Sequence, residues 1–306
     1  MMFPIEVENL SHAYGDRSAL ADVSFCVKTG EIFAFLGPNG SGKTTLFKIL
    51  TTFIPVECGE VTLLGHNLAR DSSPVRQHLG VVFQHPSLDL KLTVTENLRH
   101  HGHLYGIWGA DLKRRIRDVL GLHELDDRGD DLVETLSGGL RRRAEIAKTM
   151  LPRPRLLLLD EPSAGLDPIA RRRLLGFLNN LCVSEEVTVV LTTHILDEAE
   201  TCDRVGILNS GELVAVGTPD GLRDHISGDI VTIDSPAPDQ LAPKINRQYG
   251  CKVASVEGML RIECDGGHEF VRDVVAAFPS DIRSARFGKP TLEDVFIKLT
   301  GRRFEL

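Results

Sequence analysis

A glycine-rich segment limits the folds open to this chain more than any other stretch of its sequence. An apolar run over residues 31–36, with the composition of a buried strand, precedes it, and residues 46–50 follow it as an expected helix. Because glycine has no Cβ, the backbone between them can curl with its N–H groups inward, and the helix start adds further unpaired N–H groups. Strand, glycine-rich loop and helix in this order predict a phosphate-binding loop. The segment is Gly37-Pro38-Asn39-Gly40-Ser41-Gly42-Lys43-Thr44-Thr45.

Two side chains of this segment carry the chemistry expected of such a loop. Lys43 supplies a cation for the β- and γ-phosphates of a nucleotide, and the hydroxyl of Thr44 is a ligand for Mg²⁺. The alternative is a glycine turn with a surface lysine, which the flanking strand and helix disfavour. The loop alone does not indicate what the energy of the nucleotide drives.

Other apolar runs also end in polar side chains. The run over residues 80–83 ends at Gln84, the run over 155–159 ends at Asp160 and Glu161, and the run over 187–193 ends at His194. Continuous apolar strands that alternate with helices predict a parallel sheet covered on both faces. Because ligands bind outside the carboxyl ends of parallel strands, we expect these side chains to converge on one nucleotide. Taken singly, Asp160 and Glu161 would be better explained as a strand-end cap, and His194 as a loop histidine.

The rest of the chain predicts further parts around this core. Alternating apolar and polar residues over 3–9 and 21–28 indicate strands joined by a turn that contains Tyr14. Residues 94–152 are expected to be helical, with breaks at Gly102, Gly106, Gly121 and Gly129. From about residue 219 strand and helix signals indicate a small α/β region. We therefore expect one domain over 4–218, with a helical subdomain at about 85–152, and an accessory region over 219–306.

Composition excludes several classes of function. The chain has 306 residues and a net charge of −8, and no broad basic stripe that would predict nucleic-acid binding. We interpret Arg141–Arg143 and Arg171–Arg173 as solvated helix faces.

The six scattered cysteines indicate reduced thiols in a cytosolic protein. No apolar run approaches the ~20 residues that span a bilayer, so another polypeptide would have to supply any membrane part. A metal site at His100, His101 and His103 is the alternative to a solvated helix face.

The run Leu136-Ser137-Gly138-Gly139, placed before the acidic strand end, connects these observations. With it, the chain resembles the ATP-binding cassette (ABC) family, the nucleotide-binding subunits of ABC transporters. The resemblance covers about residues 4–218. It rests on motifs in the expected order, namely Tyr14, the phosphate loop, Gln84, Leu-Ser-Gly-Gly, Leu-Leu-Leu-Leu-Asp-Glu-Pro and His194.

The resemblance implies a P-loop NTPase (RecA-like) fold: a parallel-sheet core with an N-terminal antiparallel β subdomain, a helical subdomain and a small C-terminal α/β extension. It also implies a cofactor set of ATP and Mg²⁺, and a role for each motif residue. Tyr14 would stack on adenine, and Thr44 and Asp160 would hold Mg²⁺. Gln84 would sense Mg²⁺ and the attacking water, Glu161 would be the general base, and His194 would touch the γ-phosphate.

The same resemblance implies partners. Ser137, Gly138 and Gly139 would contact ATP bound to a second subunit, either another copy or a homologous ATPase, and Asp167 would lie in the segment that crosses between subunits. A polytopic membrane permease would be the other partner, which would place this chain peripherally on the cytoplasmic face of the cell membrane.

The branch of the family is indicated by one departure from the common pattern and by the ending of the chain. Leu140 stands where many members have Gln, and an arginine run follows it. This pattern and the ending over residues 289–302 resemble the drug-resistance and natural-product exporter branch. An amphipathic helix capped at Thr291 explains the ending equally well.

Two other functions remain as alternatives to an exporter ATPase. A soluble ABC-type ATPase acting on DNA or ribosomes usually has a coiled-coil insertion, zinc cysteines or two cassettes, and this sequence has none of these features. A regulatory module that binds ATP without hydrolysing it is disfavoured because both Glu161 and His194 are present.

Overall fold

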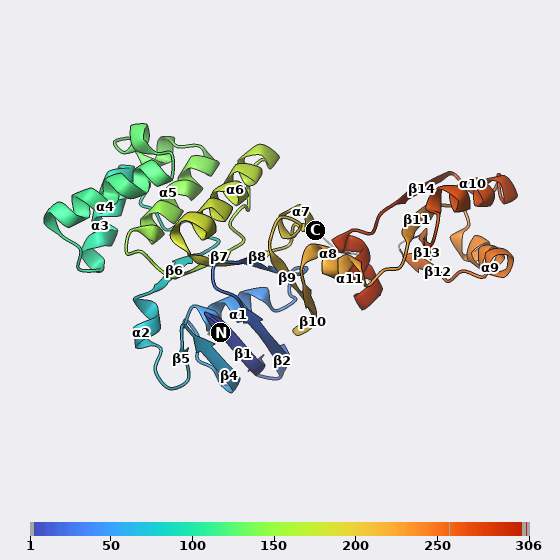
Figure 1. Cartoon of the computed structure of the whole chain (residues 1–306), viewed down its shortest axis with the longest axis horizontal. Coiled ribbons are helices and arrows are strands. Elements are labelled where there is room, and N and C mark those ends of the chain that lie inside the picture. The colour runs from blue at the N-terminus through green and yellow to red at the C-terminus, as the bar shows by residue number, and fades with distance from the viewer. Residues whose placement is uncertain (1–2, 257, 302–303, 305–306) are drawn as a thin grey trace. The chain divides into compact units, whose positions relative to one another are not determined.

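The structure is a computed structural model of the chain and describes residues 3–256, 258–301 and 304. It divides into two compact units, Met1–Val216 and Gly217–Leu306, whose elements are labelled in Figure 1. The sequence-based boundary lies after residue 218 rather than after Val216.

The first unit is built on a six-stranded sheet with the order β10-β9-β3-β8-β7-β6. From β9 to β6 neighbouring strands are parallel. Every residue of β3, β7 and β8 is buried, which explains their largely apolar sequences. The predicted parallel-sheet core is therefore confirmed. The elements of this layer are β3 (Ile32–Leu36), α1 (Lys43–Leu50), β6 (Leu79–Val82), β7 (Leu156–Asp160), α6 (Pro168–Glu185), β8 (Thr188–Thr193), α7 (Leu196–Ala199), β9 (Arg204–Asn209) and β10 (Glu212–Gly217).

An antiparallel sheet, in the order β2-β1-β4-β5, forms the N-terminal part of this unit. It shares one apolar core with the parallel sheet, in which the ring of Phe25 packs edge-on against Phe35 with centroids 4.9 Å apart. Tyr14 is the last residue of β1 rather than part of the turn, which Gly15 and Asp16 form. The elements are β1 (Ile5–Tyr14), β2 (Arg17–Val27), β4 (Cys58–Leu63), β5 (His66–Asn67) and α2 (Ser73–Arg76).

The predicted helical subdomain is a separate group of helices, shown in green in Figure 1. Gly106 and Gly129 lie between helices as expected, but the breaks predicted at Gly102 and Gly121 are wrong. Both glycines lie inside helices. A Cβ on Gly102 would come within 2.4 Å of Leu112 Cδ1, so this glycine allows two helices to pack closely. The elements are α3 (Val94–Leu104), α4 (Gly109–Leu122), η1 (Asp126–Arg128), η2 (Val133–Thr135) and α5 (Gly138–Met150).

The second unit contains a four-stranded antiparallel sheet with the order β12-β13-β11-β14. Its chain order, strand–helix–strand–strand–helix–strand, is the split βαβ arrangement of ferredoxin-like domains. Val231 and Ile262 of the sheet pack with Leu241 and Val274 of its helices in one small core. The elements are α8 (Pro219–Arg223), β11 (Asp229–Asp234), α9 (Pro238–Tyr249), β12 (Val253–Val256), β13 (Met259–Cys264), α10 (Gly267–Ala277), β14 (Ser284–Gly288) and α11 (Leu292–Thr300).

Sequence reasoning missed α9 and β14 in this unit. Helix α9 begins in a proline-rich stretch that is typical of a linker, and Pro243 lies inside it. Strand β14 is a mostly exposed edge strand with little apolar sequence. The amphipathic helix expected after Thr291 is present as α11, and Thr291 caps it in a reciprocal capping box with Asp294.

The buried His123 makes the stability of the first unit depend on pH. It is fully buried at the end of α4, 4.4 Å from the ring of Phe177, and burial lowers its pKa to about 3. The unfolded chain protonates this residue below about pH 6.5 and the folded chain does not. Stability is therefore lost as pH falls, by about 1.4 kcal/mol per pH unit.

We predict that His123→Phe removes this dependence. Between pH 6.5 and 5.5, where the histidine of the unfolded chain goes from half to almost fully protonated, the unfolding free energy of the wild type should fall by about 1 kcal/mol more than that of the variant. Urea unfolding followed by circular dichroism measures both. His66→Gln, at an exposed position, is the control and should follow the wild type. Parallel pH curves for wild type and His123→Phe would contradict the prediction.

Candidate nucleotide-binding and hydrolysis site

The phosphate loop leaves the carboxyl end of β3 and enters α1 at Lys43. Gly42 precedes the helix with φ 105°, a conformation that only glycine adopts easily. A Cβ at this position would come within 2.7 Å of the carbonyl oxygen of Ala19 and 2.9 Å of Leu20 Cδ2. The backbone of β2 therefore packs directly against the loop and stabilises its curved conformation.

The side chains of the loop fit a bound phosphate. Ser41 is 2% exposed, and its Oγ has no hydrogen-bond partner in the described part of the chain. The Nζ of Lys43 donates to the carbonyl oxygens of Gly37 and Pro38, at 2.7 and 3.0 Å. Burial lowers the pKa of Lys43, although the nearby carboxylates of Asp160 and Glu161 act in the opposite direction. A phosphate oxygen would accept from Ser41 and place a negative charge beside the buried ammonium group.

Asp160 is the last residue of β7 and is 7% exposed. The hydroxyl of Thr192 on β8 donates to its Oδ1 at 2.5 Å. Burial, and to a lesser degree the charge of Glu161, raise the pKa of Asp160, while the bond from Thr192 and the cations of Lys43 and Arg142 oppose the shift. A divalent cation at this carboxylate would favour its ionised form. Its oxygens and the hydroxyl of Thr44, which is exposed, are ligands of the kind that Mg²⁺ prefers.

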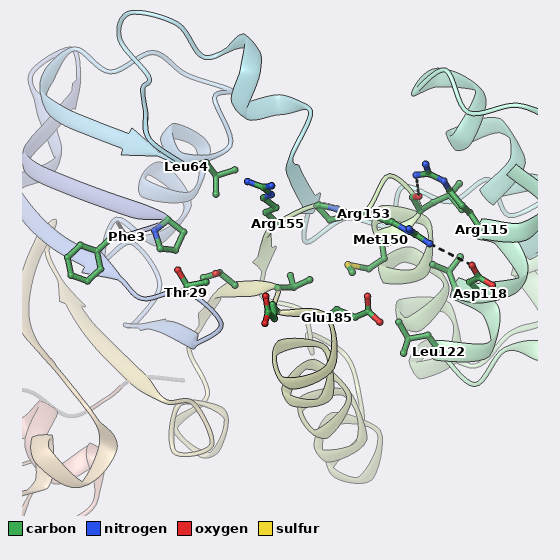
Figure 2. A pocket seen from close by; sticks show the side chains of 17 residues that line it. Phe3, Thr29, Leu64, Arg115, Asp118, Leu122, Met150, Arg153, Arg155 and Glu185 are labelled. Atoms are coloured by element: carbon green, nitrogen blue, oxygen red, sulfur yellow. Dashed lines mark hydrogen bonds and ion pairs between the residues drawn. The ribbon is translucent and has the colours of Figure 1, made fainter. Parts of the chain in front are cut away.

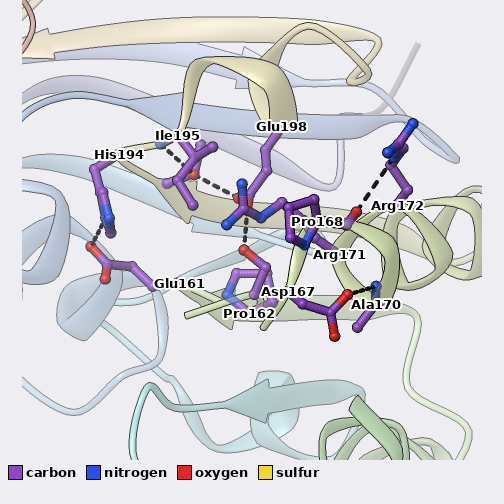
Figure 3. A network of polar contacts seen from close by, with 12 residues as sticks. Glu161, Pro162, Asp167, Pro168, Ala170, Arg171, Arg172, His194, Ile195 and Glu198 are labelled. Atoms are coloured by element: carbon purple, nitrogen blue, oxygen red, sulfur yellow. Dashed lines mark hydrogen bonds and ion pairs between the residues drawn. The ribbon is translucent and has the colours of Figure 1, made fainter. Parts of the chain in front are cut away.

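Glu161 is where the predicted catalytic side chains meet. Its backbone is in the left-handed region, with φ 44°, and its N–H donates to the hydroxyl of Thr192 at 3.0 Å. One carboxylate oxygen lies 3.1 Å from Nδ1 of His194, the contact drawn in Figure 3. The other accepts from the amide of Gln84 at 3.1 Å. Side chains from the ends of β6, β7 and β8 are thus brought together, as expected for a parallel sheet.

Tyr14 and the Leu-Ser-Gly-Gly segment lie apart from this cluster. Tyr14 is 50% exposed, and its ring meets His12 edge-on at 4.8 Å. Ser137 is exposed and caps α5, its hydroxyl accepting from the N–H of Leu140 at 3.3 Å. A Cβ on Gly139 would lie 3.3 Å from the Cβ of Ala170, on α6. The exposed start of α5 therefore packs beside the start of α6 and presents free N–H groups.

Sequence reasoning missed Arg142. The interpretation of residues 141–143 as a solvated face is wrong at this residue, whose side chain is 8% exposed and paired with Glu145 at 2.8 Å. Its guanidinium donates to the carbonyl oxygens of Phe83 and Pro162, both at 2.8 Å, and of Asp160 at 3.2 Å. Arg142 therefore ties α5 to the strand end before Gln84 and to both sides of Glu161. No local signal separates it from the neighbouring arginines.

Two of the histidines of α3 are explained by burial or by ring packing. Burial lowers the pKa of His101 to about 4, and His103 stacks on Trp108 with ring centroids 3.9 Å apart. Within the described residues no group of three or more His, Cys, Asp or Glu side chains is arranged to hold a metal ion. The same residues include no helix long and apolar enough to cross a membrane.

A cavity of about 1040 Å³ lies elsewhere in the first unit (Figure 2). Thr29, Arg155 and Thr188 are among the residues that line it, and they stand at or just before the starts of β3, β7 and β8. The phosphate loop, by contrast, follows the carboxyl end of β3. The cavity is therefore not the nucleotide site.

Comparison with known proteins agrees with this geometry. The model of the ABC transporter family matches residues 20–164. The linearmycin resistance ATP-binding protein LnrL of Bacillus subtilis is 33% identical over 97% of this chain and 98% of its own length. The Nod factor export ATP-binding protein I of Rhizobium sp. is 35% identical over 98% of both chains.

A solved structure of a similar protein contains bound nucleotide. An ATP-binding cassette in a dimeric post-hydrolysis state, bound to ADP and phosphate, is 26% identical to this chain with a TM-score of 0.63, covering 70% of this chain and 98% of its own. The fold and the site therefore define a P-loop ATPase. The chain belongs to the ABC transporter family, in the branch of drug and natural-product exporters, as an ATP-binding subunit that hydrolyses ATP.

We predict that Arg142→Met lowers the unfolding free energy of the first unit by about 3–5 kcal/mol, because Glu145 is left buried without its cation. Adding Glu145→Gln should recover at least about 1 kcal/mol. Arg141→Met, at the partly exposed neighbouring position, is the matched control and should cost less than about 1 kcal/mol. Urea unfolding measures all of these. Equal losses for Arg141→Met and Arg142→Met would refute the assignment.

Proposed function

We propose that this chain binds ATP with Mg²⁺ at its phosphate loop and hydrolyses it in a dimer, and that closure of the dimer drives movement of cargo through separate membrane subunits. The observation that supports hydrolysis most directly is the meeting of Gln84 and His194 at the two oxygens of Glu161. The export functions in the names of the relatives support the direction of transport. A soluble ATPase acting on DNA or ribosomes is not favoured.

In this proposal each residue positions ATP or water. Lys43, Ser41 and the loop N–H groups bind the phosphates, and Tyr14 stacks on adenine. Thr44 and Asp160 hold Mg²⁺, which would neutralise charge on the β- and γ-phosphates. Glu161 orients a water for in-line attack on the γ-phosphate and accepts its proton.

The neighbours of Glu161 keep it in place for this step. His194 restrains one carboxylate oxygen and would lie against the γ-phosphate, and the amide of Gln84 restrains the other oxygen. Phosphoryl transfer depends on positioning and charge stabilisation more than on covalent help, so a rigid carboxylate suits the reaction.

The loop after Gln84 gives the proposal a route to the membrane subunit. The backbone N–H of Ser87 donates to the carboxylate of Glu145 on α5, with the two atoms 2.5 Å apart. The hydroxyl oxygen of Ser87 accepts from Nζ of Lys148, also on α5, at 2.6 Å. Close to this loop Phe53 and Phe83 are 70% and 41% exposed, with ring centroids 6.5 Å apart. We propose that a cytoplasmic segment of a polytopic permease docks on these rings. This would place the chain on the cytoplasmic face of the cell membrane.

We predict that Glu161→Gln preserves ATP binding and lowers turnover at least about 100-fold, because the amide cannot accept the proton of the attacking water. The amide retains the size of the carboxylate, so the fold should be unaffected. Equilibrium ATP binding and steady-state phosphate release measure the two effects. Glu185→Gln, at an exposed position at the end of α6, is the control. Normal turnover in Glu161→Gln would sink the proposed role.

We further predict that turnover per subunit rises with protein concentration, because Ser137–Gly139 of one copy would complete the site of another. Ser137→Arg should bind ATP as the wild type does, since its own loop is intact, but it should neither dimerise nor turn over. Analytical ultracentrifugation with ATP, together with phosphate release, tests both parts. Concentration-independent turnover by a proven monomer would contradict the composite site.

A further inference from the structure

Glu198 is a buried carboxylate to which the site described above assigns no role. It lies in the short helix α7, four residues after His194, and is 1% exposed. Three side chains converge on it from separate parts of the first unit. One of its oxygens accepts from the hydroxyl of Ser163 and lies 3.3 Å from Nε of Arg171, and the other accepts from the hydroxyl of Thr193 at 2.6 Å. Figure 3 shows Glu198 and Arg171 together with the Glu161–His194 pair.

We infer that Glu198 is a positioning residue for ATP hydrolysis, which sets the placement of His194 against Glu161. The inference rests on the proposed roles of those two residues. Glu198 reaches neither of them directly, so it acts through the residues on both sides of His194 and through Ser163, which follows Glu161.

The first connection runs to the histidine. An ionised carboxylate only accepts hydrogen bonds, so the hydroxyl of Thr193 must donate to Glu198. The same Thr193 oxygen then accepts from the N–H of Ile195 at 2.9 Å. The residues on both sides of His194 are thereby held by one side chain that is itself anchored to Glu198. This fixes the direction in which the imidazole leaves the backbone.

The second connection runs to the carboxylate. Ser163 follows Glu161 by two residues and is 1% exposed, and its hydroxyl also donates to Glu198. Glu161 is held in the left-handed region, where a non-glycine residue is strained and persists only when its surroundings enforce it. Glu198 is part of that surrounding structure. It therefore sets both ends of the 3.1 Å contact between Glu161 and His194.

The third connection runs to the start of α6. The guanidinium of Arg171 pairs with Glu198. The backbone N–H of Arg171 donates to the carbonyl oxygen of Asp167 at 2.9 Å. Asp167 caps the helix, accepting from the N–H groups of Ile169 and Ala170, both at 2.9 Å. In the proposed dimer the segment that ends at Asp167 lies against the second subunit. A shift of this segment on dimer closure would thus move Arg171, one helical turn later, and with it the contact to Glu198.

The plain alternative is that Glu198 and Arg171 form a buried ion pair that contributes only to stability. The chain offers a matched control for this alternative. Glu31 is 7% exposed and pairs with Arg204 at 3.1 Å, at the start of β3 and away from the phosphate loop. Glu198→Gln and Glu31→Gln each remove one charge from a buried pair and keep the size of the side chain.

The test measures kcat and KM for ATP in the full chain, with melting temperatures recorded alongside. We expect Glu198→Gln to lower kcat by about tenfold to a hundredfold, the range that a misplacement of about 1 Å produces, with KM changed by less than about threefold. Glu31→Gln should leave kcat within about twofold at a comparable loss of melting temperature. Glu198→Asp should not restore kcat, since a shorter side chain cannot reach both hydroxyls.

A double-variant comparison identifies the path of the effect. In the His194→Ala background Glu198→Gln should cause a smaller further loss of kcat than in the wild type, because one of the two side chains that Glu198 positions is already gone. Losses that multiply in the double variant, or equal losses in Glu198→Gln and Glu31→Gln, would overturn the inference. A wild-type chain without ATPase activity would instead refute the proposed function, so the two failures are distinguishable.

Discussion

The hydroxyl of Thr192 is the group on which the hydrolytic end of the sheet depends. The parallel register of β7 and β8 places Thr192 opposite Asp160. From that position its hydroxyl donates to Asp160 Oδ1 and accepts from the N–H of Glu161. One oxygen thus orients a buried carboxylate and holds the strained backbone of the next residue, where Gln84 and His194 meet. A change of one residue in this register would move Thr192 to the other face of the sheet and separate these groups.

Buried charges surround this edge, and each is fixed by partners from distant segments. Arg142 is bonded to carbonyl groups on both sides of Glu161 and to the end of β6. Glu198 is bonded to hydroxyls that follow Glu161 and precede His194. In a low-dielectric interior such contacts are strong, and a missing partner is costly. The residues that would face a second subunit, such as Ser137, are by contrast exposed, which suits a site to be completed by a partner.

Local patterns were sufficient for most of the core and insufficient elsewhere. The apolar runs of β3, β7 and β8 predicted buried parallel strands, and their order along the chain predicted which polar residues would meet. The same reasoning failed for α9, whose prolines are typical of a linker, and for Gly102, which was taken as a helix break. In each case tertiary packing outweighed a local propensity: the apolar face of α9 is buried against the sheet of the second unit, and Gly102 is buried against Leu112.

The sequence by itself determined the phosphate loop, the strands that end in Gln84, Glu161 and His194, and membership of the ABC family. These features are local, and the direction of parallel strands carries them to one edge. Only the tertiary structure decided which arginine of the 141–143 run is buried and what anchors Glu198. Burial and pairing of these side chains depend on residues far away in the chain, such as Phe83 for Arg142 and Ser163 for Glu198. No periodicity within one helix encodes such contacts.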